Sequence, residues 1–230
     1  MLDACVLYPA PLRDILIEAA RSGLYRARWT EQIHDEWTRN LLLRRPELAM
    51  PLDRTRRLMN QAVEGCLVTG FEGRIEGISL PDPGDRHVLA AAVRCSADTI
   101  VTLNLKDFPE TVLRRYGMAA RHPDEFLLDH FGRGPAKLVT AARAVRLRLR
   151  NPARTVDEYL TTLEAQELHR VVHGLRAHAS LCCAGNWSVQ GLDGITWRTS
   201  ASPSLPGPAA RSPATSLSPP EDGRHARHLW

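Results

Sequence analysis

The first 132 residues alternate between short apolar or β-branched runs and longer segments of helical periodicity. The strand-like runs are residues 2–7, 25–29, 67–69, 99–102 and 118–120. Strands that alternate with helices pair in parallel, because each helix carries the chain back across the sheet before the next strand begins. The pattern therefore predicts an α/β domain, residues 1–132, with a mostly parallel central sheet.

Local signals set the ends of the predicted helices. Gly23 ends a helix that begins at Leu12. Thr30 is the expected N-cap of a helix whose apolar face includes Trp37, which we interpret as a core residue. Pro123 occupies the favoured first position of another helix. Further helices are predicted over residues 54–63, 85–94, 109–116 and 124–131.

Two further segments follow the α/β domain. Residues 135–181 are predicted to form a helical C-terminal extension, in which residues 136–149 make a strongly basic helix. Residues 155–158 (Thr-Val-Asp-Glu) match a capping box. Residues 184–230 are rich in Ser, Pro, Gly and Ala and carry few aliphatic side chains. Such a composition cannot bury a core, so this tail is predicted to be largely disordered.

Composition and charge narrow the class of protein. The 230 residues carry a formal net charge of +4, a mild basic excess that is compatible with nucleic acid without establishing it. No apolar run is long enough to cross a bilayer, and the first residues lack the basic lead of a secretory signal. The five cysteines form no C-x-x-C pair, which favours free thiols in a reducing compartment. We therefore expect a cytoplasmic protein.

Three acidic residues stand out by their positions. Asp3 lies within an apolar run, where burying a carboxylate is costly unless a metal ion or a hydrogen-bond donor satisfies it. Glu36 lies on the helix predicted after Thr30, with Asn40 one turn later on the same face. Asp85 opens a helix and faces its positive end. Each also has a purely structural interpretation: a buried hydrogen bond, a solvated helix residue and an N-cap, respectively.

Carboxylates without accompanying His or Cys favour hard cations, because Mg²⁺ and Mn²⁺ prefer oxygen ligands. Such ions orient a water molecule, lower its pKa and stabilise charge on a phosphodiester. A few acids are therefore sufficient for phosphodiester hydrolysis. The sequence contains no P-loop, dinucleotide fingerprint or G-x-S-x-G motif. It therefore does not support P-loop nucleotide binding, dinucleotide binding or catalysis by a serine nucleophile.

Four stretches of the sequence, in this order, resemble the PIN-domain family. They are Leu-Asp-Ala-Cys-Val-Leu at 2–7, Asp-Glu-Trp-Thr-Arg-Asn-Leu at 35–41, Leu-Pro-Asp-Pro-Gly-Asp-Arg-His-Val-Leu-Ala-Ala-Ala at 80–92, and Ile-Val-Thr-Leu-Asn-Leu-Lys-Asp-Phe-Pro at 100–109. The resemblance spans residues 1–132 and is most specific in the last two stretches. Within the family, the sequence is most similar to VapC-type toxins of type II toxin–antitoxin pairs.

The resemblance implies a three-layer α/β/α fold, a Mg²⁺ or Mn²⁺ cofactor and endonucleolytic cleavage of RNA. The residues it assigns to catalysis are Asp3, Glu36 and Asp85, with Asn104 at the fourth position. The expected metal ligands are Asp3, Asp85 and Asp107. At Asn104 the family often has Asp, so this chain has one carboxylate fewer, although an amide carbonyl can still bind an ion or its water. The family also implies an antitoxin partner and a homodimer.

Three polar residues near the acids are candidates for substrate binding: Asn40, Arg86 and Lys106. His34 and His87 lie next to the acids on their helices. A metal-activated water does not need a histidine base, so we expect exposed or capping roles for both.

The leading hypothesis is a Mg²⁺-dependent endoribonuclease, the toxin of a toxin–antitoxin pair, whose helical extension contacts antitoxin or RNA. Two other functions fit the same sequence. Asn104 and the short segment before Asp3 allow a PIN-fold protein that binds RNA or a partner without cleaving it. A structure-specific DNA nuclease is the other alternative, because fold alone does not fix the substrate.

Overall fold

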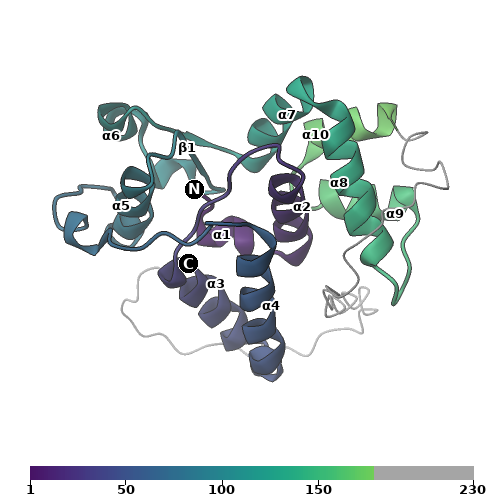
Figure 1. Cartoon of the computed structure of the whole chain (residues 1–230), viewed down its shortest axis with the longest axis horizontal. Coiled ribbons are helices and arrows are strands. Elements are labelled where there is room, and N and C mark those ends of the chain that lie inside the picture. Colours follow the sequence, from purple (N-terminus) through teal and green to yellow (C-terminus); the bar gives the residue numbers. More distant parts are fainter. Residues whose placement is uncertain (179–230) are drawn as a thin grey trace, which may run out of the picture. The chain divides into compact units, whose positions relative to one another are not determined.

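A computed structural model describes residues 1–178, which all belong to one compact unit. Helices dominate the fold, and a small parallel sheet lies among them (Figure 1). The chain thus has the predicted α/β fold, with a smaller sheet than expected. Within the described residues, no helix combines the length and apolar character needed to cross a bilayer. The predicted tail, residues 184–230, lies outside the described residues.

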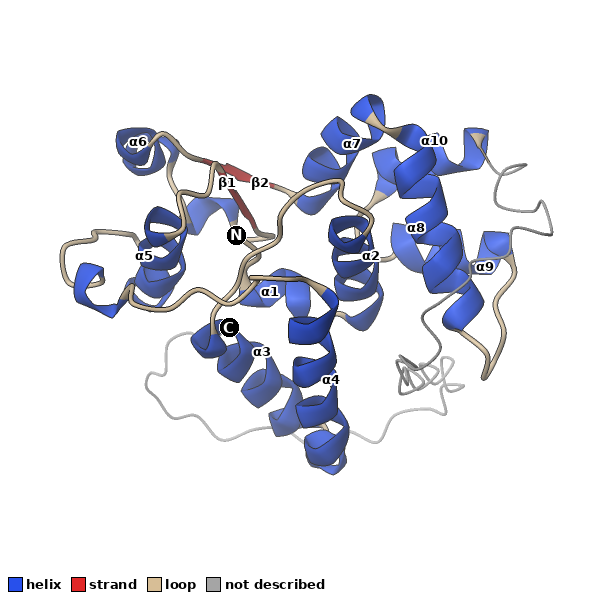
Figure 2. Ribbon diagram, viewed as in Figure 1, coloured by secondary structure: helices blue, strands red, loops and turns tan. Residues whose placement is uncertain are grey.

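The sheet consists of two parallel strands, β1 (Thr99–Val101) and β2 (Ala119–Arg121), drawn in red in Figure 2. Leu2 continues the sheet on β1 through a parallel bridge to Val101. Val101 N donates to Met1 O at 2.8 Å, and Asp3 N donates to Val101 O at 3.1 Å. Asp3 therefore lies just beyond the point where the extended segment ends.

Several predicted strands are shorter than the sequence pattern indicates. Residues 2–7 are extended only as far as Asp3, because its side chain accepts a hydrogen bond from Ala4 N (2.6 Å) and caps a short helix, α1 (Ala4–Leu7). Residues 25–29 and 67–69 meet in a single parallel bridge between Trp29 and Leu67. A short apolar run indicates that its side chains are buried, but it does not indicate that its backbone pairs with another strand. The sequence pattern therefore predicts more strand residues than the structure contains in the described part of the chain.

The helices of the first 122 residues follow the predicted order. They are α2 (Ala10–Arg21), α3 (Glu31–Arg44), α4 (Ala49–Ala62), α5 (Arg86–Arg94) and α6 (Glu110–Leu113), with 3₁₀ turns η1 (Pro46–Leu48), η2 (Glu72–Arg74), η3 (Pro83–Asp85), η4 (Leu105–Asp107) and η5 (Arg114–Tyr116). Thr30 caps α3 as predicted, its hydroxyl accepting from Ile33 N at 3.0 Å. Trp37 on this helix is fully buried, which confirms it as a core residue. Helix α4 begins five residues before the predicted start, with Pro51 in its first turn, where no helical N–H is required.

His34 corrects the expectation that the histidines near the acids are exposed or capping. Its side chain is fully buried on α3. Trp37 Nε1 donates to His34 Nδ1 at 3.0 Å, and His34 Nε2 lies 2.9 Å from Asn60 Oδ1. Since Nδ1 accepts, the ring proton is on Nε2, which donates to Asn60. Burial lowers the pKa of His34, in keeping with this neutral ring. The histidine therefore belongs to a buried polar network that joins α3 to α4.

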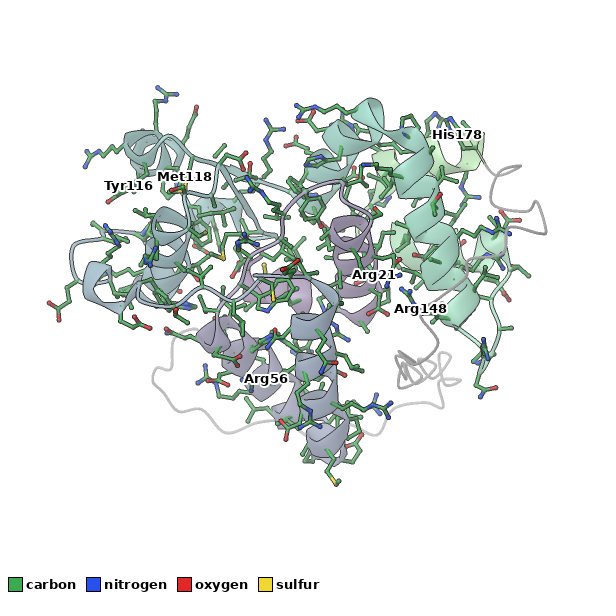
Figure 3. The ribbon with its side chains drawn as sticks, viewed as in Figure 1. Arg21, Arg56, Tyr116, Met118, Arg148 and His178 are labelled. Carbon is green, nitrogen blue, oxygen red and sulfur yellow. The ribbon has the colours of Figure 1, made fainter. Side chains whose placement is uncertain are left out.

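Four helices make up the rest of the described chain: α7 (Pro123–Arg133), α8 (Pro135–Arg148), α9 (Val156–Glu164) and α10 (His169–Ala177). Helix α8 packs along α2. Figure 3 labels Arg148 on α8 and Arg21 on α2, whose side chains both reach Glu18, at 2.8 Å and 3.3 Å. Arg148 of the basic helix thus ties α8 to α2, so this arginine serves the packing of the fold.

A second polar contact fixes the end of this helical region. Asp124, in the first turn of α7, is buried, and its two carboxylate oxygens accept from Arg170 N (3.1 Å) and Val171 N (2.9 Å). These N–H groups belong to the first turn of α10, which has no side-chain cap of its own. Asp124 therefore caps α10 from another helix.

We expect Asp124→Ala to lower the free energy of unfolding by about 1–3 kcal/mol, because it leaves the N–H groups of Arg170 and Val171, the latter buried, without their acceptor. Glu125→Ala is the matched control, since Glu125 shares the first turn of α7 and is exposed. Urea unfolding of both variants, followed by circular dichroism, measures the difference. Equal losses would show that the acids act only through the dipole of α7.

Candidate active site

Asp3 is buried between the end of β1 and the start of α1. Besides the bond from Ala4 N, its carboxylate accepts hydrogen bonds from Cys5 Sγ at 3.0 Å and Thr102 Oγ1 at 2.7 Å. Burial raises the pKa of Asp3, the bonds from Cys5 and Thr102 oppose this rise, and the charge of Glu36 adds to it. The carboxylate is therefore held in one orientation by neutral donors.

Thr102 and Cys5 also tie the loop after β1 to this carboxylate. Thr102 Oγ1 accepts from Asn104 N at 3.0 Å, and Cys5 Sγ accepts from Leu103 N at 3.2 Å. Sequence reasoning assigned neither Thr102 nor Cys5 to the site. The signal for Thr102 was its position at the carboxyl end of a parallel strand, where ligands of such sheets gather.

Asp85 ends the turn η3 and occupies the N-cap position of α5, but its side chain makes no capping hydrogen bond. Its pKa is raised to about 7, first by burial and then by the charges of Asp3, Asp82, Asp107 and Glu36. A carboxyl group responds to its neighbours in this way when they lie close around it. The three predicted acids and Asp107 therefore share one acidic neighbourhood, to which Asp82 also belongs.

Glu36 is held by a histidine from a different helix. His87 Nε2, on α5, lies 3.4 Å from Glu36 Oε2, on α3. His87 is buried, so the expectation of an exposed or capping residue is wrong here too. Its Nδ1 is buried and has no hydrogen-bond partner among residues 1–178. The contact joins α5 to α3 and directs the Glu36 carboxylate.

Comparison with known proteins identifies the family. Residues 1–106 match the family model described as "PIN domain". This part of the chain is therefore a PIN domain. Residues 123–177, which include helices α7 to α10, match a second model, described as "VapC50 C-terminal domain". The two matches place this chain with the VapC-type members of the family, as the sequence motifs predict.

One curated relative is "Putative ribonuclease VapC50" of Mycobacterium tuberculosis (strain ATCC 25618 / H37Rv). It is 64% identical to this chain over 45 residues, which are 20% of this chain. The match spans about a quarter of the relative's length (27%). No solved structure matches this chain.

The other predicted site residues of the PIN domain lie on its surface or at its edge. Asn104 and Lys106 are exposed in and before the turn η4, and Asn40 is exposed on α3, one turn after Glu36. Arg86 is half-buried at the start of α5. Within residues 1–178, none of these four side chains makes a hydrogen bond or an ion pair. Their roles in binding substrate stay predictions.

The acids of the PIN domain suit a divalent cation by charge and donor type. Within residues 1–178, no Lys or Arg forms an ion pair with Asp3, Asp85 or Asp107. In the same range, no three Asp, Glu, His or Cys residues are arranged as a ready-made metal site. Uncompensated carboxylates are the ligands that Mg²⁺ and Mn²⁺ prefer. The cluster therefore fits such an ion chemically, although its side chains do not form a closed ligand set.

Proposed function

We propose that this PIN-domain protein is a Mg²⁺- or Mn²⁺-dependent endoribonuclease, the toxin of a toxin–antitoxin pair in the cytoplasm. The observation that carries this proposal is the acidic neighbourhood of half-buried Asp85, where burial and the charges of Asp3, Asp82, Asp107 and Glu36 raise the pKa of Asp85. Such a concentration of negative charge is unfavourable unless a cation binds. The similarity to "Putative ribonuclease VapC50" supports RNA as the substrate.

Each acid has a distinct role in this proposal. Asp3, Asp85 and Asp107 would hold the ion, which when bound activates a water molecule and stabilises charge on the phosphodiester. Three hydrogen-bond donors fix the Asp3 carboxylate, so its oxygens would keep the same orientation toward the ion throughout the reaction. Glu36, positioned by His87, would accept the proton of the attacking water.

The remaining predicted residues would act on the substrate. Arg86 and Lys106 would contact phosphate oxygens beside the scissile bond, and Asn40 would contact the adjoining nucleotide. Asn104 would ligate the ion or its water through the amide carbonyl. We place a cognate antitoxin over this acidic site, and we propose that the protein forms a homodimer, because the resemblance to VapC-type toxins implies both.

The test is cleavage of 5′-labelled RNA by the full chain with Mg²⁺, Mn²⁺ or EDTA, together with Glu36→Gln. We expect metal-dependent cleavage that the variant slows by about 100-fold, the usual scale for a lost general base. Glu64→Gln is the matched control, since Glu64 is exposed and lies outside the acid cluster. Cleavage that persists in EDTA, or that Glu36→Gln leaves unchanged, would overturn the proposal.

Asn104 motivates the second candidate, a PIN-fold protein that binds RNA without cleaving it. Under the leading proposal, Asn104→Asp adds a carboxylate to the site and lowers the Mg²⁺ concentration for half-maximal cleavage by about tenfold, equivalent to ~1.4 kcal/mol. Magnesium titrations of both proteins measure this shift. Cleavage by the Asp variant alone would instead identify a binding protein, and faster cleavage of flapped DNA than of RNA would identify a DNA nuclease.

A further inference from the structure

A cavity of about 640 Å³ opens beside the two-stranded sheet. Its lining includes Thr99 and Ala119, the first residues of β1 and β2, together with residues 24–28 and part of α7. Leu2 and Val101 also line it, but the acids Asp3, Glu36, Asp82, Asp85 and Asp107 do not. The cavity is therefore separate from the acidic site, and its volume is in the range of small-molecule sites.

Arginine dominates the charge of this cavity. Four arginines line it: Arg26, Arg28, Arg121 and Arg133. Arg121 is neutralised by Asp129, since its Nη1 lies 2.5 Å from Asp129 Oδ2. The other three arginines make no ion pair within residues 1–178. Asp98 is the remaining acid of the lining, so the lining has three such arginines for one carboxylate. Arg28 Nη1 also donates to Ala27 O at 3.2 Å.

Aromatic side chains give the cavity a firm wall. The rings of Tyr25 and Phe126 meet edge to face with centroids 4.7 Å apart, and His130 packs on Phe126 at the same distance. Tyr25 Oη donates to Leu16 O at 2.7 Å, which fixes its ring. Burial, followed by the charge of Arg133, lowers the pKa of His130, so its ring is neutral near pH 7 and can donate one hydrogen bond. A wall packed in this way supports a preformed site.

We propose that this cavity binds a phosphate monoester through Arg26, Arg28 and Arg133. The excess of two positive charges matches the charge of a phosphate monoester at neutral pH, which is about −1.5 to −2. Guanidinium groups bind phosphate through paired, charge-assisted hydrogen bonds, and three of them offer more donors than one carboxylate can accept. A free nucleotide and the 5′-phosphate end of an RNA strand share this chemistry.

The test measures binding to the full chain in EDTA, so that no ion at the acidic site contributes. The probes are inorganic phosphate, adenosine 5′-monophosphate, adenosine, and one short RNA with a 5′-phosphate or a 5′-hydroxyl. Isothermal titration calorimetry compares wild type with the double variant Arg26→Gln/Arg133→Gln. Arg54→Gln/Arg57→Gln is the control, because it removes the same charge from exposed positions on α4.

We expect the wild type to bind the 5′-phosphorylated probes, and the cavity variant to bind them at least roughly tenfold more weakly, a loss of charge-assisted hydrogen bonds. The control should retain wild-type affinity. Binding of the mononucleotide identifies a free nucleotide as the source, and binding of the phosphorylated RNA alone identifies a strand end. Equal binding of adenosine, equal losses in both variants, or no binding of any phosphorylated probe would overturn the proposal.

Discussion

Asp3→Asn should reduce RNA cleavage roughly 1,000-fold, a loss of about 4 kcal/mol in transition-state stabilisation, the scale expected when a metal-binding carboxylate is removed. The physical reason is charge, because Asn keeps the shape of Asp and can still accept from Ala4 N. The Thr102 hydroxyl can rotate to accept from the new amide. Activity is therefore expected to fall while the fold is kept.

The measurement pairs single-turnover cleavage with urea unfolding, which separates chemistry from stability. Asp3→Ala is the informative comparison, since it leaves Ala4 N and the Thr102 hydroxyl without their acceptor. It should cost about 1–3 kcal/mol of unfolding free energy in addition to activity. If Asp3→Asn cleaves RNA at the wild-type rate, Asp3 is not a ligand of the metal ion.

The helices were predictable because their ends carry local chemical signals. Thr30 caps α3, Pro123 opens α7, and Thr155 and Glu158 form the capping box of α9. The strands were less predictable, since pairing depends on residues far away in the chain. The run 2–7 shows why: its apolar side chains are buried as expected, but Asp3 caps α1 and ends the extended segment.

The acids of the site were predictable for a related reason. A carboxylate inside an apolar run or at the start of a helix stands out in the sequence itself. Thr102 and Cys5 do not stand out, because both types are common, and the bond from Thr102 to Asp3 joins residues 99 positions apart. His87 stands out in the sequence, but its contact with Glu36 joins two helices, α5 and α3, that are far apart in the chain.

Asp85→Asn should make the metal-free protein more stable than wild type at pH 8. Folding raises the pKa of Asp85 from about 3.8 to about 7, so between these values the folded state holds a proton that the unfolded state releases. The stability of the wild type therefore falls as the pH rises from 4 to 7, and it levels off above 7. The amide of the variant does not titrate, so the advantage of the variant should grow over that interval, reaching on the order of 1 kcal/mol after allowance for solvent screening.

Urea unfolding in EDTA at pH 5, 6, 7 and 8 measures this difference, and Asp53→Asn on the exposed face of α4 is the control.

Magnesium should reverse the order of stability at pH 8. An ion that binds only the folded wild type adds RT ln(1 + [Mg²⁺]/Kd), about 2.7 kcal/mol at 100 times Kd, whereas the variant has lost a ligand. Wild-type cleavage at limiting Mg²⁺ should then fall about tenfold per pH unit below 7, because the proton competes with the ion for Asp85. If the difference in unfolding free energy between Asp85→Asn and wild type in EDTA does not change with pH, folding does not raise the pKa of Asp85.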